Sequence, residues 1–254
     1  MCLIALAYEA SEKYKIVIAA NRDEFLDRPA APAYWWEGAD LLAGRDIRAK
    51  GTWLGITRTG RIAAITNYRD LINKKEFSTS RGSLVTGFLL TGISPEKYLE
   101  ALSRDARNYD GYNLIWGTPS ELFYFSNKEG DGIKLGKGVH LLSNHLLNTP
   151  WFKSVKFREG FEKILQNEGD PEEQLLTLLK DPEKAPDTML PSTGLPYDAE
   201  KNISSVYITM GNYGTRCSTI ITIDYDDNVV FTEAGHQPEK NFRKFNFRIE
   251  PPQI

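Results

Sequence analysis

The chain opens with two apolar runs, Met1-Cys2-Leu3-Ile4-Ala5-Leu6-Ala7-Tyr8 and Ile16-Val17-Ile18-Ala19-Ala20-Asn21-Arg22-Asp23-Glu24. Both runs have the length and the residue types of β-strands, and the polar segment between them is typical of a hairpin connection. In an antiparallel hairpin, the end of the second strand lies beside the start of the first. The sequence therefore predicts that Cys2 and the Asn-Arg-Asp-Glu cluster at 21–24 are neighbours in space.

Cys2 is placed to act as a nucleophile. Initiator methionine is usually removed when a small residue follows it, and removal would give Cys2 both a thiol and a free α-amine. Such an amine has an ordinary pKa of about 7.7–8 and the thiol one of about 8.5, so the amine can take the proton of the thiol. Asp23 would then orient the amine and hold its charge. The alternative is that Cys2 is a small apolar residue in a buried strand.

The composition is that of an ordinary globular protein. The chain has 254 residues, of which 41% are hydrophobic, and this suits a single domain spanning 1–254 with a sizeable core. The formal net charge of -3 gives no basic surface for nucleic acid and no polybasic segment for anionic membranes. No apolar run approaches the length of about 18 residues that a membrane-spanning helix needs, so we expect no integral membrane segment. The first residues lack the basic region of a signal peptide.

The two cysteines, Cys2 and Cys217, provide neither a disulfide framework nor the spacing of a metal site. This usage fits a reducing compartment, and we expect a cytoplasmic protein. We expect neither a metal ion nor a cofactor.

Glycine, proline and capping residues divide the remaining sequence into short elements. Helices are expected from Ser80 to Gly92 and from Ser94, Thr149 and Asp170 onward, with Val155 on the inward face of the third. Strands alternate with these helices in blocks, which favours an α+β fold of two stacked antiparallel sheets with a helix pair on each outer face. The strands are expected at 41–46, 51–57, 61–67, 112–116, 122–125, 138–144, 206–210, 217–224 and 229–232.

Two segments are expected to be loops. Tyr34-Trp35-Trp36 follows Pro29 and Pro32, and it either covers the edge of the core or forms the wall of a binding cleft. Residues 181–203 are rich in proline and lack a usable periodicity. A loop of this length is either functional or disordered, so it is either a lid over the site or a loose excursion.

Several polar residues occur where an apolar strand ends or begins, namely Asn21, Asp23, Asn67, Asn144 and Arg216. Singly, each is more simply explained as a cap, a turn residue or a surface ion pair. Together with Cys2 they provide a thiol, a carboxylate, amide donors and a guanidinium. These are the parts that acyl transfer needs, because amide side chains can donate to a developing oxyanion.

The opening Met-Cys-Leu-Ile, together with Asn21-Arg22-Asp23-Glu24-Phe25 and Arg28-Pro29, resembles the NRDE family, also called the transport-and-Golgi-organisation family. The layout of that family resembles the N-terminal-nucleophile hydrolases, especially the choloylglycine hydrolase and penicillin V acylase group. The resemblance implies a four-layer αββα fold. It covers nearly the whole chain, with further matching stretches at 43–46, 51–55, 66–69, 80–82, 109–113, 142–144 and 214–218.

The resemblance also implies roles for single residues. Cys2 matches the nucleophile, and Asp23 matches the aspartate that holds the α-amine. Asn67, which Tyr68 follows, matches an oxyanion-hole position. Asn144 matches a second asparagine near the amine, and Arg216 matches a late arginine that supports the nucleophile.

Other residues are expected to support the site or to bind substrate. Asn21, Arg22 and Glu24 belong to the first group, and Trp35, Trp36 and Tyr68 to the second. The chain departs from the hydrolases at Ala20, where they carry an arginine three residues before the aspartate. Arg22 is near this position, but in an extended strand it is expected to point to the other face.

The leading hypothesis is a cysteine N-terminal-nucleophile amidohydrolase that cleaves linear C–N amide bonds through a thioester on Cys2. The aromatic trio and the proline-rich loop indicate an apolar acyl group, but bile-salt-like, fatty-acyl and peptide amides stay open. The expected partner is therefore a small-molecule acyl amide or another hydrophobic ligand. Association into a homo-oligomer stays open as well.

Two alternatives remain. The first is a non-catalytic protein that handles or traffics heme or lipid on the same scaffold. Its axial ligand would be Cys2, His140, His145 or His236, and the heme would be bound noncovalently because no Cys-x-x-Cys-His sequence occurs. The second is a redox sensor that pairs Cys2 with Cys217.

Overall fold

The computed structural model describes residues 2–71, 79–167 and 169–251. Its first two strands, β1 (Cys2–Tyr8) and β2 (Tyr14–Phe25), form the predicted antiparallel hairpin. Cys2 lies opposite Arg22 in the register, and Tyr8 lies opposite Ile16. Met1, and with it the question of its removal, lies outside the described residues.

This hairpin is at the centre of the first sheet, whose strands follow the order β10-β1-β2-β12-β13-β14, with β11 paired to β12. All of these pairs are antiparallel. The two strands of the hairpin are therefore flanked on both sides, by β10 and by β12. The further strands are β10 (Gly138–Leu142), β11 (Thr209–Met210), β12 (Tyr213–Asp224), β13 (Asn228–Gly235) and β14 (Asn241–Arg248).

The second sheet is an antiparallel meander in which spatial order follows chain order, from β3 to β9. The connection between β6 and β7 is long, and its described part contains two α-helices and a short 3₁₀ helix. The strands are β3 (Ala30–Trp35), β4 (Leu41–Asp46), β5 (Leu54–Thr57), β6 (Ile62–Asn67), β7 (Tyr112–Thr118), β8 (Glu121–Ser126) and β9 (Ile133–Lys134).

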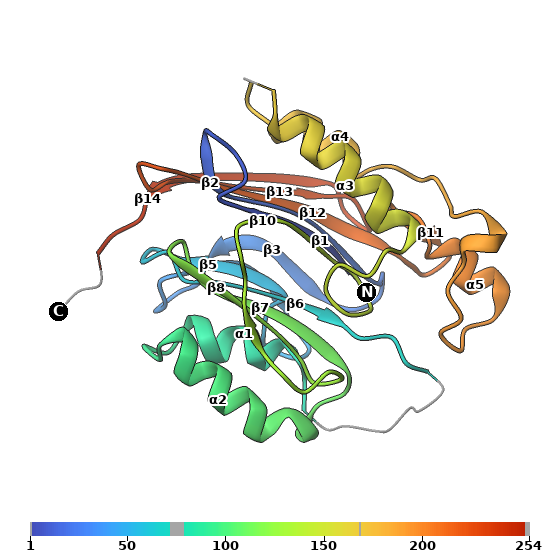
Figure 1. Ribbon diagram of the computed structural model, residues 1–254, viewed down its shortest axis with the longest axis horizontal. Coiled ribbons are helices and arrows are strands. Elements are labelled where there is room, and N and C mark those ends of the chain that lie inside the picture. The colour runs from blue at the N-terminus through green and yellow to red at the C-terminus, as the bar shows by residue number, and fades with distance from the viewer. Residues whose placement is uncertain (1, 72–78, 168, 252–254) are drawn as a thin grey trace.

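The two sheets stack face to face, and each carries a helix pair on its outer face (Figure 1). Helices α1 (Gly82–Leu89) and α2 (Pro95–Asp105) pack on the second sheet, and α3 (Phe152–Leu165) and α4 (Glu172–Leu178) pack on the first. The prediction of a four-layer α+β sandwich is therefore confirmed. Short helical turns complete the described chain at Ala106–Asn108, Asp187–Met189 and α5 (Tyr197–Asn202).

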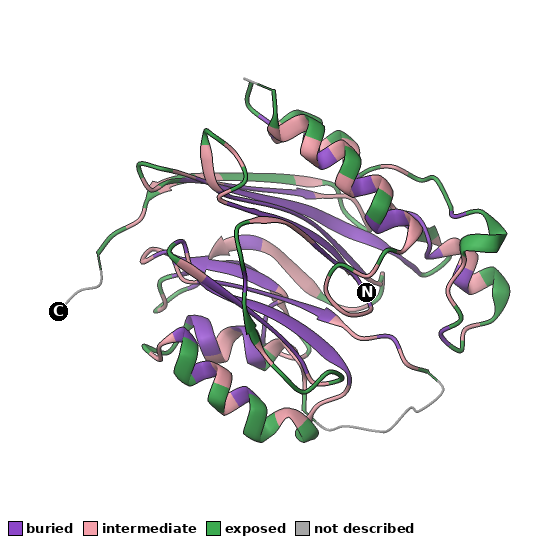
Figure 2. Cartoon of the chain, viewed as in Figure 1, coloured by how far each residue is buried: buried purple, intermediate pink, exposed green. Residues whose placement is uncertain are grey.

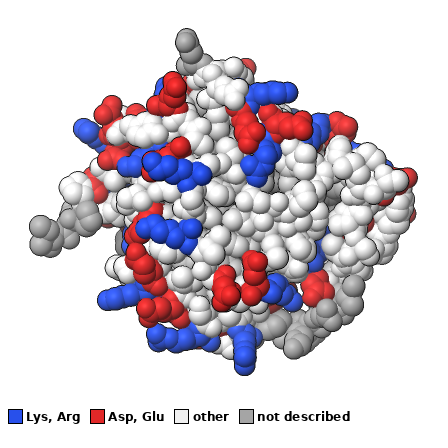
Figure 3. All heavy atoms as spheres, in the orientation of Figure 1, with Lys and Arg blue, Asp and Glu red and all other residues white. Residues whose placement is uncertain are grey.

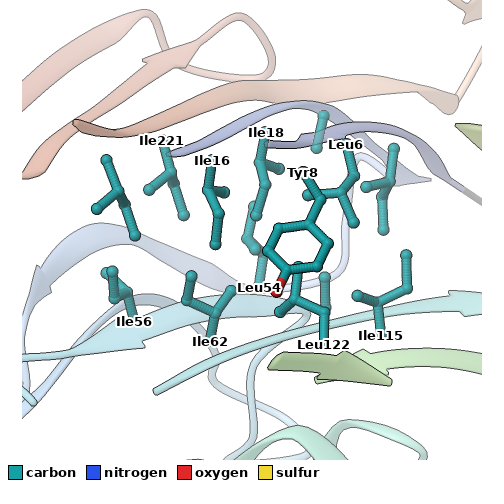
Figure 4. Packing of buried hydrophobic residues seen from close by; sticks show 14 of the residues in the cluster. Leu6, Tyr8, Ile16, Ile18, Leu54, Ile56, Ile62, Ile115, Leu122 and Ile221 are labelled. Carbon is teal, nitrogen blue, oxygen red and sulfur yellow. The ribbon is translucent and has the colours of Figure 1, made fainter. Parts of the chain in front are cut away.

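The alternation of side chains along β1 explains its central position. Ile4, Leu6 and Tyr8 face the second sheet and belong to the core between the two sheets. Figure 4 shows residues of this core approaching from both sheets. Leu3 and Ala5 belong to the core under α3 and α4. Both faces of the strand are thus buried, as the purple ribbon in Figure 2 shows, and Cys2 continues the row that faces the other sheet.

Some elements differ from the expectation. The segment with Trp35 is the edge strand β3, not a loop, because an edge strand with a register shift after Ala31 tolerates the missing amide hydrogen of Pro32. Phe157 and Phe161 form the buried face of α3, whereas Val155 is exposed. The strand expected at 206–210 shrinks to β11, and β14 was missed because its outward residues are mostly polar.

The helix starts also differ in detail. Ser94 caps α2 as predicted, since its hydroxyl accepts from the backbone amide of Lys97. The N-cap of α1 is Arg81, not Ser80, and that of α4 is Pro171. In the described part of the chain, no helix is both long enough and apolar enough to cross a membrane. On the face drawn in Figure 3, acidic and basic side chains are mixed.

Candidate active site

Cys2, Arg22 and Cys217 form one row across three neighbouring strands, because Arg22 is the register partner of both cysteines. Arg22 therefore shares its face with Cys2, and also with Ala20 two residues before it. We expected Arg22 to point to the opposite face of the strand from Ala20, and this was wrong. The side chain of Arg22 is on the opposite face only from that of Asp23. The structure thus places a guanidinium beside the candidate nucleophile, although not at the sequence position that the hydrolases use.

The same row argues against a direct Cys2–Cys217 disulfide. Neighbouring strands are about 4.8 Å apart, so the two cysteines are separated by about 10 Å. A disulfide needs α-carbons within about 7 Å. The redox pair considered from the sequence would therefore require the backbone to move.

A pocket of about 120 Å³ opens in front of Cys2. Five of the predicted site residues line it together, namely Cys2, Arg22, Asp23, Glu24 and Asn67. Trp53 and Asp46 form the wall around Arg22. The Arg22 guanidinium lies 4.1 Å from the centre of the Trp53 ring and 3.5 Å from the Asp46 carboxylate. The remaining wall includes Arg28 and residues 80–82 at the start of α1.

Asp23 is buried, with 2% of its surface exposed. Its Oδ1 accepts a hydrogen bond of 2.7 Å from Thr215 Oγ1, and its backbone carbonyl accepts one of 3.1 Å from Tyr213. Burial raises the pKa of the Asp23 carboxyl, and the nearby Lys153 is the strongest of the charges that oppose this rise. Burial also raises the pKa of the half-buried Cys2 thiol, whereas Arg22 acts in the opposite direction.

Asn144 ties the ends of three strands together behind Cys2. Its side chain is fully buried, and its Nδ2 donates to the backbone carbonyl of Asn67 at 3.0 Å. The backbone carbonyl of Asn144 accepts a hydrogen bond of 2.8 Å from the backbone amide of Arg69. The neighbouring Ser143 hydroxyl donates to the carbonyl of Cys2 at 3.2 Å. Asn144 therefore positions Asn67 at the pocket, while its own side chain does not line the pocket.

Arg216 occupies the bulge between Thr215 and Cys217. Its guanidinium donates to the carbonyls of Phe25 at 2.8 Å, Arg28 at 2.9 Å and Gln237 at 2.8 Å. It thus fixes the segment that follows β2, and with it Arg28. Arg216 lines a second cavity of about 290 Å³, which shares Arg22, Arg28 and Trp53 with the pocket at Cys2.

The two other predicted supporting residues make local contacts. Asn21 Nδ2 donates to the carbonyls of Leu179 at 2.8 Å and Val206 at 3.0 Å, so it fastens β2 to the segments at its outer face. Glu24 Oε2 lies 3.8 Å from the Arg28 guanidinium at the rim of the pocket.

The three aromatic residues expected to bind substrate do not line the pocket at Cys2. Because β3 runs through Trp35, the two tryptophans point to opposite faces of the second sheet. Trp35 packs on the core between the sheets, and Trp36 packs under α1 and α2. Tyr68 turns away to a hydrogen bond of 2.9 Å with His145 Nε2. The aromatic wall of the pocket is Trp53 instead, which was not among the predicted site residues although it lies in the stretch 51–55 that matches the family.

Three buried charged residues behind Asp23 were missed from the sequence, namely Arg69, Lys153 and Glu200. Arg69 and Glu200 form an ion pair of 2.5 Å with side chains 5% and 6% exposed. Lys153 Nζ donates to the carbonyl of Ile203 at 3.1 Å, and burial lowers its pKa to about 8. Glu200 and Ile203 lie at the end of the proline-rich segment, and this end therefore packs behind the site. None of residues 181–203 lines the pocket at Cys2, so the segment does not form a lid over that pocket.

The histidines considered as heme ligands already have protein partners. His145 Nδ1 contacts Thr149 Oγ1 at 2.9 Å, His236 Nε2 contacts Ser218 Oγ at 2.8 Å, and His140 Nε2 contacts the Gly136 carbonyl at 2.8 Å. Among residues 2–71, 79–167 and 169–251, no three His, Cys, Asp or Glu side chains gather where they could hold a metal ion.

A sequence model of the family described as Transport and Golgi organisation 2 matches residues 1–238. The chain belongs to this family. The human Transport and Golgi organization protein 2 homolog is 34% identical over 258 residues, covering 92% of this chain and 93% of the human protein. The Transport and Golgi organization protein 2 of Drosophila melanogaster is 26% identical, and the alignment covers 96% of both chains.

Solved structures share the fold of this Transport and Golgi organisation 2 family member. The penicillin V acylase from Agrobacterium tumefaciens matches 97% of this chain and 86% of its own, with a TM-score of 0.54 and 11% identity. An N-acylethanolamine-hydrolyzing acid amidase ortholog from Caenorhabditis elegans matches 87% of this chain and 92% of its own, with a TM-score of 0.52 and 10% identity. The predicted likeness to N-terminal-nucleophile hydrolases is therefore confirmed for the fold.

Proposed function

We propose that this protein is a cysteine N-terminal-nucleophile amidohydrolase that cleaves linear C–N amide bonds through a thioester on Cys2. The observation that carries the proposal is the arrangement around Cys2. The thiol lies at the start of a central strand and lines a pocket together with the buried Asp23 and with Asn67. The names of the two structures that share the fold, a penicillin V acylase and an acid amidase, describe enzymes that cleave amides and support this reaction class.

In the first half of the proposed reaction, Sγ of Cys2 attacks the amide carbonyl carbon. The α-amine that Cys2 has after removal of Met1 takes the thiol proton and passes it to the leaving nitrogen as the C–N bond breaks. The side-chain amide of Asn67 donates to the oxyanion, and Asp23 holds the amine. In the second half, water attacks the thioester, the amine takes a proton from this water, and the carboxylic acid leaves as the thiol is restored.

The two cavities suggest how the substrate lies. The cavity of about 290 Å³ has a mixed lining, in which Leu26, Pro29 and Ile47 are apolar. Arg216, Glu233 and Glu239 add charges to it, and Arg22, Arg28 and Trp53 line both this cavity and the pocket at Cys2. A substrate group with both apolar and polar parts fits the larger cavity if its amide reaches across Trp53 to the thiol. We therefore propose an N-acyl amide as the substrate class.

The first test is the intact mass of the untagged protein before and after treatment with a thiol-reactive acylating probe at neutral pH. We expect a mass without Met1 and rapid labelling that maps to Cys2. A panel of N-acyl amides with short, long and aromatic acyl groups then tests hydrolysis by release of the amine. Cys2→Ser should retain the fold and lose hydrolysis, whereas Cys217→Ser should keep it. Retained Met1, or full activity of Cys2→Ser, would contradict the proposal.

A further inference from the structure

Asn67, the proposed oxyanion donor, lies where its strand has lost one neighbour. β5 pairs with β6 only as far as Ala64, and β6 runs on to Asn67 at the wall of the pocket. No residue in the described part of the chain hydrogen-bonds the side-chain amide of Asn67. The amide is therefore available to a substrate, and its direction depends on how the backbone around Asn67 is held.

That backbone is held from the other sheet. Asn144 Nδ2 donates to the carbonyl of Asn67 at 3.0 Å, and the backbone amide of Arg69 donates to the carbonyl of Asn144 at 2.8 Å. Asn144 follows β10, which belongs to the sheet of Cys2, whereas Asn67 ends a strand of the second sheet. These two bonds therefore tie residues 67–69 to the sheet that carries the nucleophile.

A third bond joins the same two segments through side chains. The Tyr68 hydroxyl lies 2.9 Å from His145 Nε2, and the two ring centres are 4.9 Å apart. Thr149 Oγ1 donates its single hydrogen to the carbonyl of Leu146 at 2.7 Å, so it accepts from His145 Nδ1 at 2.9 Å. Nε2 is then the acceptor, and Tyr68 donates to it. Burial lowers the pKa of His145, which favours this neutral form at pH 7.

His145 is itself fixed to the strands beside Asn67. The side chain of Asn113 on β7 is fully buried, and its Nδ2 donates to the carbonyl of His145 at 3.0 Å and to Thr66 Oγ1 at 3.1 Å. Thr66 is the residue before Asn67, and Tyr68 is the residue after it. Hydrogen bonds therefore connect both sides of Asn67 to the same histidine, directly through Tyr68 and by way of Asn113 from Thr66.

We propose that Tyr68 and His145 are positioning residues for the oxyanion donor. The hydrogen bond between them holds the backbone that follows Asn67, and so directs the Asn67 side-chain amide at the oxyanion that forms when Cys2 is acylated. A donor that is already in place stabilises this charge without reorganising during the reaction. The inference rests on the proposed function, because an oxyanion forms only when the thiol attacks a carbonyl carbon.

Two probes of Cys2 separate the oxyanion from the reactivity of the thiol. With p-nitrophenyl acetate, the deprotonated Sγ bonds to the carbonyl carbon, an oxyanion forms, and p-nitrophenolate leaves as the thioester is completed. With iodoacetamide, Sγ displaces iodide from a saturated carbon and no oxyanion forms. Both rates follow the amount of thiolate, so their ratio cancels it and reports the stabilisation of the oxyanion. Peptide mass mapping assigns each rate to Cys2.

The variants remove this bond from either side. Tyr68→Phe should lower the ratio of acylation to alkylation about two- to tenfold, which is the range that one neutral hydrogen bond supports. His145→Leu should match it, and the double variant should be no lower than either single one, because both remove the same bond. His145→Gln keeps an acceptor near the position of Nε2 and should stay close to the wild-type ratio. Asn67→Ala removes the donor itself and should lower the ratio about 100-fold or more.

A matched variant separates this effect from a general loss of structure. Tyr8→Phe removes a tyrosine hydroxyl that donates to the carbonyl of Ser120 at 2.8 Å. Tyr8 lies on β1, the strand of Cys2, but at its opposite end, and the ratio should stay at the wild-type value. An equal fall in Tyr8→Phe and Tyr68→Phe would overturn the inference. If His145→Leu does not fold, Tyr68→Phe and His145→Gln carry the test.

The outcomes distinguish this inference from the proposed function. A wild-type ratio in a folded Tyr68→Phe protein, with a lowered ratio in Asn67→Ala, overturns the positioning role and leaves hydrolysis standing. A lowered ratio in Tyr68→Phe without cleavage of any tested amide supports the positioning role and counts against hydrolysis. An unchanged ratio in Asn67→Ala overturns both this inference and the place of Asn67 in the proposed reaction.

Discussion

Arg69→Met removes one partner of an ion pair in which both side chains are buried. The guanidinium and the Glu200 carboxylate are 2.5 Å apart, with side chains 5% and 6% exposed. Breaking such a pair on one side leaves an uncompensated buried charge and costs about 3–5 kcal/mol. For a chain of 254 residues this corresponds to a fall of about 6–20 °C in the melting temperature.

A double-mutant cycle assigns this cost to the pair. Arg69→Met combined with Glu200→Gln removes both charges, so the combined loss should be smaller than the sum of the single losses by at least about 2 kcal/mol. Urea unfolding at pH 7 measures each variant. As the control, Arg104→Met breaks an exposed pair with Glu100 and should cost under about 0.5 kcal/mol. Single losses that add to within about 0.5 kcal/mol would refute the reasoning.

Three further predictions concern the surroundings of the site. Gly51→Ala should lower the free energy of unfolding in urea by roughly 1–3 kcal/mol, because the new methyl would lie 2.8 Å from the backbone of the first residue of α1. At Gly92 a new methyl meets no atom within 4 Å, so Gly92→Ala should lower it far less. Equal losses in the two variants would contradict this. Burial lowers the pKa of His236 to about 4, so the unfolded chain binds a proton that the folded chain does not as pH falls from about 6.5 to 4. Stability should fall over that range, and more steeply than in His236→Gln when both are unfolded in urea; parallel curves would count against it. Arg22→Gln removes the cation beside Cys2, so labelling of the thiol by iodoacetamide at pH 7 should slow and should recover at high pH, and an unchanged rate would be evidence against an effect of Arg22 on the thiol.

The sequence predicted more of the fold than of the site. Two strand-length apolar runs that are buried on both faces can only lie at the centre of a sheet covered on both sides, so the hairpin and its neighbours were predictable. The residues 21–24 were also predictable as neighbours of Cys2, because hairpin register follows from the connection. The edge strand β14 was not, because its exposed face shows little apolar alternation.

The buried charges at the site were missed for one physical reason. Lys153 and Glu200 are charged residues, and local sequence gives no sign that a charge is buried. Their burial depends on contacts between segments far apart in the chain, such as the Lys153 bond to Ile203. For Trp35 the error was local, since proline was taken to end a strand that in fact continues at a sheet edge.

The hydrogen bond between Thr215 and Asp23 has a consequence for how the protein is made. It joins residues 192 positions apart, and β2 has no partner on that side until β12 has been synthesised. At about 5–20 residues per second, a ribosome needs roughly 10–40 s to cover that distance. During this time β2 is a free, apolar strand edge of the kind that promotes aggregation. The site residues therefore come together only late in translation, and the nascent chain depends on protection of that edge until then.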